Sequence, residues 1–291
     1  MKIAFIGLGV MGYPMAGHLK KNGFDITVYN RTKSRAERWA IEYQSTQIAN
    51  TPADAAKDAD LVITCVGNDD DLYSVIAGES GAALTMKAGS TLVDHTTASA
   101  KIARKLAEEL HSKGVQFIDA PVSGGEQGAI NGQLTIMCGG EPEAFAKIQN
   151  IINCYARQTT LMGPIGSGQL TKMVNQICIA GLIQSLAEGV QFAENAGLDP
   201  LLVFDVISKG AAQSWQMVNR HKTMIEGEFN HGFAVNWMRK DLAICLEEAR
   251  LNGSQLPVAA LVDQFYAEVQ QMGGGRWDTS SLLNRFKQPQ K

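Results

Sequence analysis

The chain has 291 residues, of which 45% are hydrophobic and 19% charged, the composition of a folded protein with room for two domains. Its formal net charge of -3 gives it no general attraction to nucleic acid or to an anionic membrane surface. The five cysteines have no paired spacing, which argues against a disulfide framework and a metal site and favours reduced thiols in the cytoplasm.

The first thirty residues predict a dinucleotide-binding turn. Residues 3–6 form an apolar run typical of a buried strand, residues 14–21 have helical spacing, and residues 25–29 form a second strand pattern. Between the first strand and the helix lies a Gly-x-Gly-x-x-Gly motif whose residues we expect to contact the cofactor: Gly7, Leu8, Gly9, Val10, Met11 and Gly12. The first glycine permits the tight turn, the second lets the backbone approach a pyrophosphate, and the third lets the helix pack on the strand. The helix N-terminus supplies N–H groups and a partial positive charge for the anion. Because a strand begins so early, we expect no signal peptide.

The end of the second strand indicates which dinucleotide is bound. NAD sites usually place Asp or Glu there to bind the ribose 2′-hydroxyl, but this chain has Asn30, Arg31 and Thr32. The planar guanidinium and the hydroxyl would both suit a 2′-phosphate. Alternatively, residues 31–35 are simply a solvated helix start with Thr32 as its N-cap. We expect NADP rather than NAD.

Strand and helix patterns then alternate as far as residue 163. We expect further helices at 36–44, from 51 onward, and at 70–76, 99–113 and 143–152. We expect further strands at 45–49, 61–66, 91–94, 115–119, 134–138 and 160–162. This alternation predicts an α/β fold with a doubly wound, mostly parallel sheet, a Rossmann domain over residues 1–163. Ligands bind such sheets outside the carboxyl ends of the strands, which selects the loops 7–12, 67–71, 95–97 and 120–128.

These strand-end loops supply further candidate residues. Val66, Gly67 and Thr96 are expected to contact the cofactor, and the threonine could reach a ribose or a carboxamide. The segment Ser123-Gly124-Gly125 presents a hydroxyl and two backbone N–H groups together, a nest that suits a substrate carboxylate. The alternative is a turn with a serine cap.

The composition changes at the Gly/Pro-rich segment 163–168, which we take as a domain junction. Almost everything beyond it has helical spacing, with expected helices at 169–195, 200–209, 213–224, 238–252 and 258–272. Residues 164–291 therefore form an all-α domain on a long central helix. That helix is apolar nearly all round, so we expect it to be buried on most faces and to pair chains into a homodimer or homotetramer. Lys172, Glu188 and Glu194 interrupt it, so we expect no membrane span.

Lys172 is the sharpest candidate for catalysis in the second half of the chain. It lies near the start of the apolar helix, and Asn175 lies one turn later on the same face. A lysine among apolar neighbours must extend to solvent, pair or take part in chemistry. Because this helix begins at the domain junction, where a ligand cleft is expected, the lysine could pass a proton to or from a substrate oxygen. Asn175 could orient the lysine or the substrate.

Four motifs in order resemble the β-hydroxyacid dehydrogenase family over essentially the whole chain. They are residues 5–16, residues 119–125, Gly168-x-x-x-Lys172-x-x-Asn175, and Lys240-Asp241-Leu242. Members of this family include 3-hydroxyisobutyrate dehydrogenase, tartronate semialdehyde reductase and the glyoxylate/succinic semialdehyde reductases.

The resemblance implies a role for most of these residues. Lys172 would be the catalytic acid/base, Asn175 would bind the substrate, and Ser123, Gly124 and Gly125 would grip its carboxylate. Thr96, Phe233 and Lys240 would lie on the cofactor side. The implied reaction passes a hydride between NADP and the β-carbon of a small hydroxy acid.

Two segments indicate different branches of the family. Residues 30–32 resemble the NADP-using aldehyde reductases and favour reduction. Residues 211–219 resemble the 3-hydroxyisobutyrate and serine dehydrogenases.

Three alternatives remain open. An imine reductase shares the architecture, but such proteins usually lack the lysine found here at position 172. A non-catalytic dinucleotide-binding scaffold would not need Lys172, Asn175 and Ser123 together. A decarboxylating 6-phosphogluconate dehydrogenase would need a longer C-terminal domain than this chain has.

Overall fold

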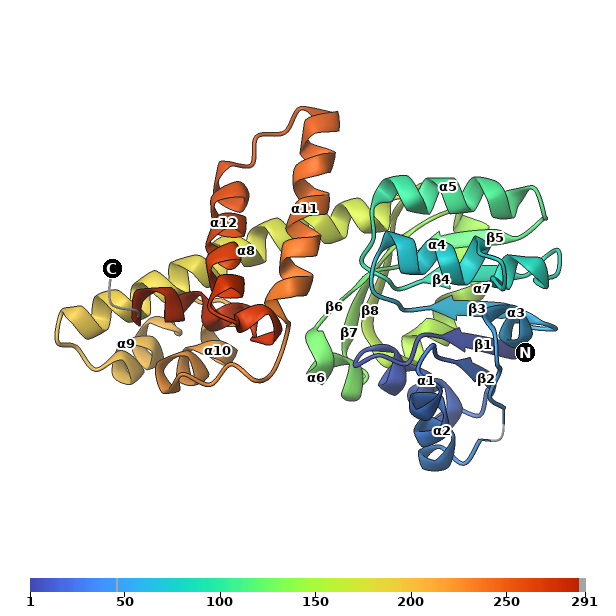
Figure 1. The fold of residues 1–291 in the computed structure, drawn as a ribbon, viewed down its shortest axis with the longest axis horizontal. Coiled ribbons are helices and arrows are strands. Elements are labelled where there is room, and N and C mark those ends of the chain that lie inside the picture. The colour runs from blue at the N-terminus through green and yellow to red at the C-terminus, as the bar shows by residue number, and fades with distance from the viewer. Residues whose placement is uncertain (46, 288–291) are drawn as a thin grey trace. The chain divides into compact units, whose positions relative to one another are not determined.

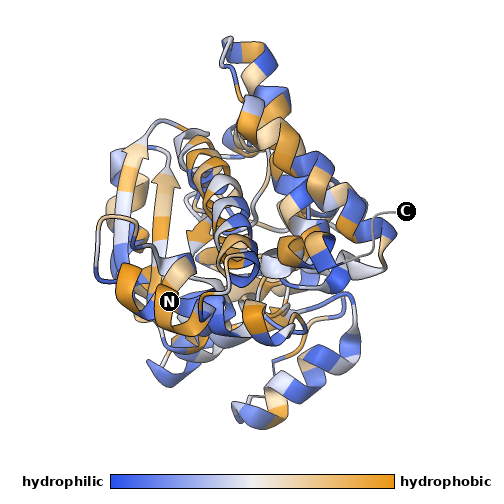
Figure 2. Ribbon diagram, turned by 90° about the vertical axis from the view of Figure 1, so that its left-hand side faces the viewer, coloured by the Kyte–Doolittle hydropathy of each residue, from blue (hydrophilic) through white to orange (hydrophobic). Residues whose placement is uncertain are grey.

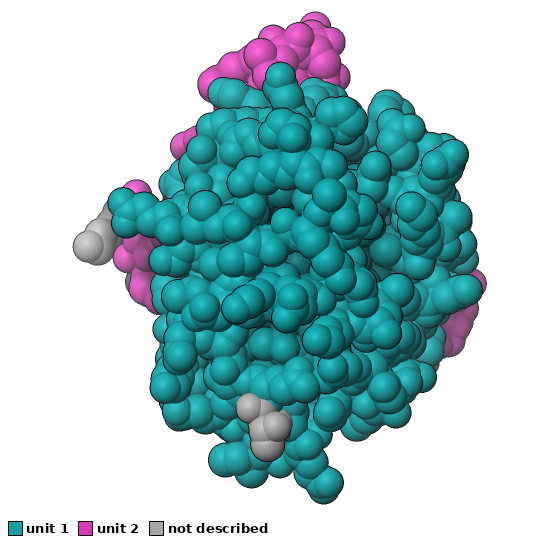
Figure 3. Space-filling view, turned by 90° about the vertical axis from the view of Figure 1, so that its right-hand side faces the viewer, with its two compact units in different colours: residues 1–172 teal, residues 173–291 magenta. Residues whose placement is uncertain are grey.

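The computed structural model (Figure 1) describes residues 1–45 and 47–287. The chain forms two compact units, Met1–Lys172 and Met173–Lys291, which Figure 3 shows in different colours. We call them unit 1 and unit 2.

Unit 1 alternates strands and helices. Its strands are β1 (Lys2–Ile6), β2 (Asp25–Tyr29), β3 (Leu61–Thr64), β4 (Thr91–Asp94), β5 (Gln116–Asp119), β6 (Val122–Ser123), β7 (Leu134–Gly139) and β8 (Ala156–Gly163). Its helices are α1 (Gly12–Lys21), α2 (Lys33–Glu42), α3 (Pro52–Ala56), α4 (Asp69–Ala77), α5 (Ala100–His111), α6 (Gly125–Ile130) and α7 (Pro142–Ile152). Two short 3-10 turns are η1 (Ala82–Leu84) and η2 (Asn153–Tyr155).

The eight strands form one sheet in the order β2-β1-β3-β4-β5-β7-β6, with β8 paired to β7. The first five strands are parallel, and β7 runs antiparallel to β5 and β6 and parallel to β8. Ile3 and Phe5 of β1 enter one core cluster, and Ala4 and Ile6 enter another, so both faces of this strand are buried. The predicted doubly wound, mostly parallel sheet is therefore confirmed.

Three local predictions differ from the structure. The predicted strand at 45–49 is wrong for its described residues, because Ile48 makes only an isolated bridge to Val28; residue 46 lies outside the described part. The loop 120–128 contains β6 and α6, which were not predicted. The strand expected at 160–162 is longer and begins at Ala156. Its start was not predicted, because Arg157 and Gln158 are polar and exposed and give no apolar signal.

Unit 2 is helical, as predicted. Helix α8 (Ser167–Asn195) runs into it from unit 1 and is followed by α9 (Pro200–Ile207), α10 (Trp215–Glu226), α11 (Val235–Asn252), α12 (Pro257–Gln271), and the 3-10 segments η3 (Gly274–Arg276) and η4 (Thr279–Lys287). Local signals explain the helix ends. Ser214 accepts a bond from the Met217 N–H to cap α10, and Gly253 ends α11 in the left-handed conformation. In Figure 2 the helices carry both hydrophobic and hydrophilic residues, as amphipathic helices do.

The division into two units falls inside α8, after Lys172, whereas the predicted domain boundary follows residue 163. The first turn of α8 groups with unit 1 because its backbone and the Gln169 side chain bind Asp119 and the loop after β4.

Helix α8 is only partly buried in the single chain. Val174, Leu182 and Phe192 are 61%, 43% and 72% exposed in the single chain. By length and composition the helix could also cross a bilayer, which the sequence analysis did not expect, and 44% of its most apolar 18-residue stretch is buried. Gln176 and Gln184 are buried along it, as in a helix that packs in a protein core.

Candidate active site

The glycine-rich turn between β1 and α1 has the geometry that a bound pyrophosphate requires. Gly7 has φ of +101°, and a Cβ there would collide with the Cys65 carbonyl. A Cβ at Gly12 would collide with the carbonyl of Gly7. A Cβ at Gly9 would instead meet no atom within 4 Å, so space remains for a ligand beside the backbone. The first turn of α1 contains no acidic residue, so an anion is not repelled. These residues fit the phosphates of a dinucleotide.

Asn30, which follows β2, braces this turn. Its Oδ1 accepts a hydrogen bond from the Leu8 N–H at 2.9 Å, and its Nδ2 donates to the Thr32 carbonyl at 2.9 Å. Both ends of the amide are therefore used by the chain itself. The expected contact of Asn30 with the cofactor stays a prediction.

Arg31 and Thr32 differ from Asn30 in the contacts that their side chains make. The Arg31 side chain is 83% exposed, and its Nη1 lies 2.7 Å from Asp71 Oδ1 at the start of α4. Thr32 occupies the N-cap position of α2, but within the described chain its hydroxyl makes no capping bond. The simple helix-cap interpretation of Thr32 therefore lacks the hydrogen bond that would define it.

The structure brings two of the predicted cofactor loops together. Thr96 is only 1% exposed, and its Oγ1 accepts a hydrogen bond from the Val66 N–H at 3.0 Å. Gly67 lies two residues before α4, which begins at Asp69. Asp94 holds this arrangement, because its Oδ1 accepts bonds from Thr64 Oγ1 at 2.7 Å and from the Thr96 N–H at 3.0 Å. Burial raises the pKa of Asp94 to about 7.

Lys172 is 8% exposed and lies in the second turn of α8. The preceding turn is held by Asp119 at the end of β5, which accepts bonds from the N–H groups of Gly166 at 2.7 Å and Gln169 at 2.9 Å. Burial raises the pKa of Asp119 to about 6, against the lowering effect of these N–H donors. Neither Asp119 nor Gln169 was predicted from the sequence to have a role; the available signal was a glutamine at the apolar start of a helix.

The predicted carboxylate-binding segment is a turn that begins at Ser123, the last residue of β6, and its two glycines are exposed. Ser123 ends the strand, and Gly124 and Gly125 have φ of +128° and +63°, which a side chain would not tolerate without strain. Helix α6 begins at Gly125. Carboxylate binding by this turn stays a prediction.

Unit 2 carries Asn175, Phe233 and Lys240. Asn175 Nδ2 donates to Gln176 Oε1 at 2.8 Å, and Gln176 Nε2 donates to Asp241 Oδ2 at 2.6 Å. Lys240 Nζ lies 2.9 Å from Asp241 Oδ1 as an ion pair. A series of polar contacts thus connects Asn175 to Lys240 through Gln176 and Asp241. No role was predicted for Gln176 or Asp241. Phe233 packs against the core of unit 2.

His95 has a structural position beside the Asp94 network. Its Nδ1 lies 2.6 Å from the Ala120 carbonyl, and its Nε2 lies 2.8 Å from the Tyr155 hydroxyl. Because a carbonyl can only accept, Nδ1 carries the proton and Nε2 accepts from the tyrosine. Burial lowers the pKa of His95 from 6.5 to about 4, so the ring is neutral near pH 7.

This neutral ring predicts a specific acid sensitivity. Between pH 6.5 and about 4 the unfolded chain binds a proton at His95 that the folded chain does not, so its stabilising contribution falls as the pH falls. The loss reaches about 3 kcal/mol. His95→Gln does not titrate, so the wild-type advantage measured by urea unfolding at pH 7.5 should shrink at pH 5. A constant difference between the two proteins would contradict the assignment.

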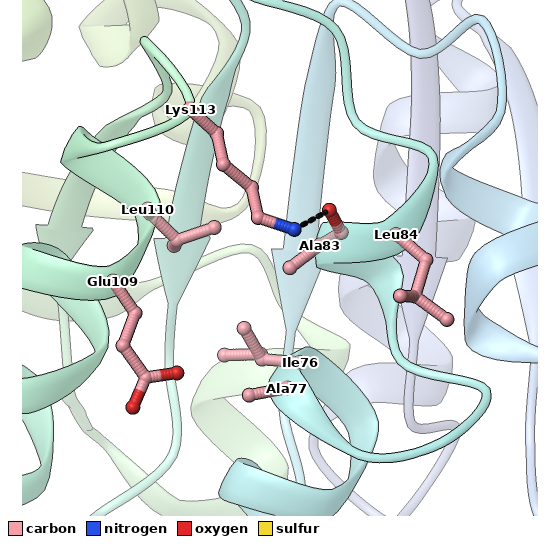
Figure 4. Close-up of a pocket in the computed structure, with 7 residues that line it drawn as sticks. All are labelled: Ile76, Ala77, Ala83, Leu84, Glu109, Leu110 and Lys113. Atoms are coloured by element: carbon pink, nitrogen blue, oxygen red, sulfur yellow. Dashed lines mark hydrogen bonds between the residues drawn. The ribbon is translucent and has the colours of Figure 1, made fainter.

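One cavity of about 100 Å³ lies elsewhere in unit 1 (Figure 4). It is lined by Ile76, Ala77, Ala83, Leu84, Glu109, Leu110 and Lys113, and Lys113 Nζ donates to the Ala83 carbonyl at 2.8 Å. Helices α4 and α5 end here, where the next strands begin. The cavity is therefore at the amino edge of the parallel strands and is not part of the candidate site.

Family models match both halves of the chain. Residues 2–163 match the NAD binding domain of 6-phosphogluconate dehydrogenase. Residues 166–286 match a domain described as the NAD-binding of NADP-dependent 3-hydroxyisobutyrate dehydrogenase.

Relatives span nearly the full length. An uncharacterised oxidoreductase of Shewanella frigidimarina is 62% identical over 98% of each chain. The 2-hydroxy-3-oxopropionate reductase of Escherichia coli is 32% identical over 99% of this chain and 97% of its own. The crystal structure of 3-hydroxyisobutyrate dehydrogenase from Salmonella typhimurium matches with a TM-score of 0.88 and 25% identity, over 98% of this chain and 100% of that one.

Proposed function

This chain belongs to the β-hydroxyacid dehydrogenase family of NAD(P)-dependent oxidoreductases that act on CH–OH groups, and from that premise we propose that it reduces a small semialdehyde or glyoxylate to the hydroxy acid with NADPH. The observation that carries the proposal is Lys172. It is a buried lysine at the start of α8, in the helix turn that follows Gln169, and Gln169 is bonded to the loop that contains Thr96. A buried cation beside a cofactor loop suits proton transfer to a substrate oxygen.

The chain's own residues would divide the work as follows. The glycine-rich turn and the N-terminus of α1 would hold the pyrophosphate, and Arg31 and Thr32 would bind the 2′-phosphate. The cofactor, when bound, supplies the hydride. Ser123, Gly124 and Gly125 would hold the substrate carboxylate. The role proposed for Asn175 is substrate binding.

Lys172 would act as the general acid in this direction. Its ammonium would give one proton to the oxygen of the aldehyde as that oxygen becomes an alkoxide. In the oxidising direction the neutral amine would take the hydroxyl proton back. Phe233 and Lys240 would lie on the cofactor side.

Steady-state oxidation of NADPH and NADH tests this function. The aldehydes are the succinic, methylmalonic and tartronate semialdehydes and glyoxylate, and the control substrates are 3-hydroxyisobutyrate, serine and a cyclic imine. We expect reduction of at least one aldehyde with NADPH well above NADH. NAD-linked oxidation of 3-hydroxyisobutyrate or serine without aldehyde reduction would overturn the cofactor and direction assignments. Reduction of the imine alone would favour an imine reductase.

The preference for NADPH is expected to depend on Arg31. Its exposed guanidinium has donors beyond the one that faces Asp71, and a charge-assisted bond to a phosphate contributes about 1.5 kcal/mol at such a site. Arg31→Ala should therefore raise the KM for NADPH by about tenfold and leave the KM for NADH unchanged. The matched control is Arg38→Ala on α2, the helix that follows Arg31; the Arg38 guanidinium lies over the Tyr13 ring. Equal effects of Arg31→Ala on both nucleotides would show that Arg31 does not read the phosphate.

We also propose that the chain forms a homodimer or homotetramer. The exposed apolar side chains on α8, Val174, Leu182 and Phe192, support this proposal, because such surface is normally covered. Sedimentation velocity should show a species of at least twice the chain mass. A single species with the mass of one chain would overturn it.

We also propose that the protein is located in a reducing compartment such as the cytoplasm. No disulfide bond is formed among the described cysteines, as is usual for proteins of such compartments. Fractionation of the producing cells would test it, and recovery in an oxidising compartment would contradict it.

A further inference from the structure

We infer that Gln169 is a positioning residue that sets Lys172 against the cofactor-side loop after β4, an inference that rests on the proposed function. Gln169 lies three residues before Lys172, so it occupies the preceding turn on the same side of α8. Its side chain is fully buried. It is bound at both its backbone and its side chain by segments far away in the sequence.

The side chain of Gln169 makes two hydrogen bonds to one loop. Its Oε1 accepts from the Ala98 N–H at 3.1 Å, and its Nε2 donates to the Thr96 carbonyl at 2.7 Å. The backbone N–H of Gln169 donates to Asp119 Oδ2 at 2.9 Å, and Asp119 Oδ1 accepts from the Gly166 N–H. The start of α8 is therefore fixed to the ends of both β4 and β5.

The backbone around the Asp119 carboxylate is closely packed. A Cβ at Gly168 would lie 2.8 Å from Asp119 Oδ2, and a Cβ at Gly139 would lie 2.9 Å from the same atom. The two glycines let the carboxylate approach the backbone of α8 closely. The helix start cannot shift without breaking bonds to a buried carboxylate.

The same loop is tied to the second cofactor loop. Thr96 Oγ1 accepts from the Val66 N–H, so Val66, Thr96 and Gln169 form one continuous set of contacts that leads to the turn carrying Lys172. Proton transfer needs heavy atoms at about 2.6–3.2 Å. A misplacement of about 1 Å can cost a hundredfold in rate. Gln169 would thus control the rate although it touches neither substrate nor cofactor.

A neutral amide is the group this position requires. The loop offers one donor, the Ala98 N–H, and one acceptor, the Thr96 carbonyl, and a glutamine side chain satisfies both. A glutamate of the same length can do so only when it is protonated, because its ionised form cannot donate to the carbonyl.

Gln169→Ala is the first test, with Gln184→Ala as the matched control. Gln184 is another buried glutamine of α8, and it bonds only to Glu188 among the contacts described. We expect Gln169→Ala to lower kcat by about 30-fold and to raise the primary isotope effect with 4-deuterated NADPH, with the NADPH dissociation constant changed by less than about threefold. The backbone amide of Ala98 should exchange faster with deuterium. The control should lower the melting temperature without these changes.

Gln169→Glu is the second test, because it separates positioning from general stability. Its activity relative to wild type should rise as the pH falls, since only the protonated carboxyl restores both bonds. The charged or titratable groups around it are Asp94 on β4, His95 in the loop after β4, Arg104 on α5 beside Gly166, Asp119 on β5 and Lys172 on α8. The two aspartates favour the protonated form of the glutamate, and a positive charge on Arg104 or Lys172 opposes it. Wild type measured in parallel corrects for their titration.

Two results would overturn the inference. One is a Gln169→Ala enzyme no slower than the Gln184→Ala control, and the other is a Gln169→Glu enzyme with the wild-type pH profile. If the wild type itself reduces no aldehyde, the proposed function fails separately. In that case unchanged Ala98 exchange in Gln169→Ala would still overturn the structural part of the inference, and faster exchange would support it.

Discussion

Lys172→Ala is expected to lower kcat for aldehyde reduction by about a thousandfold and to leave NADPH binding within a few-fold of wild type. A positioned general acid contributes about 10²–10⁴ in rate, and Lys172 is a buried lysine in the part of α8 fixed to the loop after β4. The predicted phosphate contacts lie in the turn between β1 and α1 and in the segment after β2, so they do not depend on this side chain. Stopped-flow reduction and fluorescence titration with NADPH would measure the two effects separately.

Two further variants define the cause of the loss. Lys172→Arg keeps the positive charge, but its guanidinium does not give up a proton in this pH range, so it should also be inactive. Lys147→Ala removes an exposed lysine from α7 and should behave as wild type. A Lys172→Ala enzyme that kept more than a tenth of the wild-type kcat would show that another group supplies the proton.

The second large effect is expected from a pair of glycines in one turn. Gly9→Ala places its methyl group in open space, so the protein should fold with an unchanged melting temperature. That space is where we expect the pyrophosphate, so the dissociation constant for NADPH should rise by about a hundredfold, equivalent to about 2.7 kcal/mol.

Gly12→Ala is the matched comparison because its methyl group would collide with the Gly7 carbonyl. It should lose stability by at least 2 kcal/mol, in the range of overpacked core positions. Calorimetry of both variants, with and without NADPH, separates a binding defect from a folding defect. If Gly9→Ala bound NADPH as tightly as wild type, the cofactor would not approach this turn as proposed.

Local sequence patterns were sufficient to predict most of the fold. Short apolar runs marked β1 and β3, because strands of a parallel sheet are buried on both faces. Helical spacing and cap residues marked the helices of unit 2. The predictions were weakest where the chain is polar, at the short elements β6 and α6 and the exposed first half of β8, since those segments have no apolar periodicity.

The candidate site was predictable only in part. Motif spacing selected Lys172 and the glycine-rich turn as candidates, because the chemistry proposed for them depends on neighbours in the sequence. The contacts around these residues could not be predicted. Gln169 binds Thr96, 73 residues away in the sequence, and Arg31 binds Asp71, 40 residues away. Such pairs are set by the tertiary fold, and one sequence contains no local signal for them.

The most direct test of the central claim is to follow deuterium into the product of the best aldehyde substrate from NADPH that is deuterated at both C4 positions. Mass spectrometry of the product formed by the wild type should find one deuterium on the carbon that was the aldehyde carbon. Lys172→Ala should form the same product at a rate lower by about three orders of magnitude. Product with deuterium formed equally fast by both proteins would contradict the role of Lys172. NADPH that binds but transfers no deuterium to any of the aldehydes would contradict the proposed reaction itself.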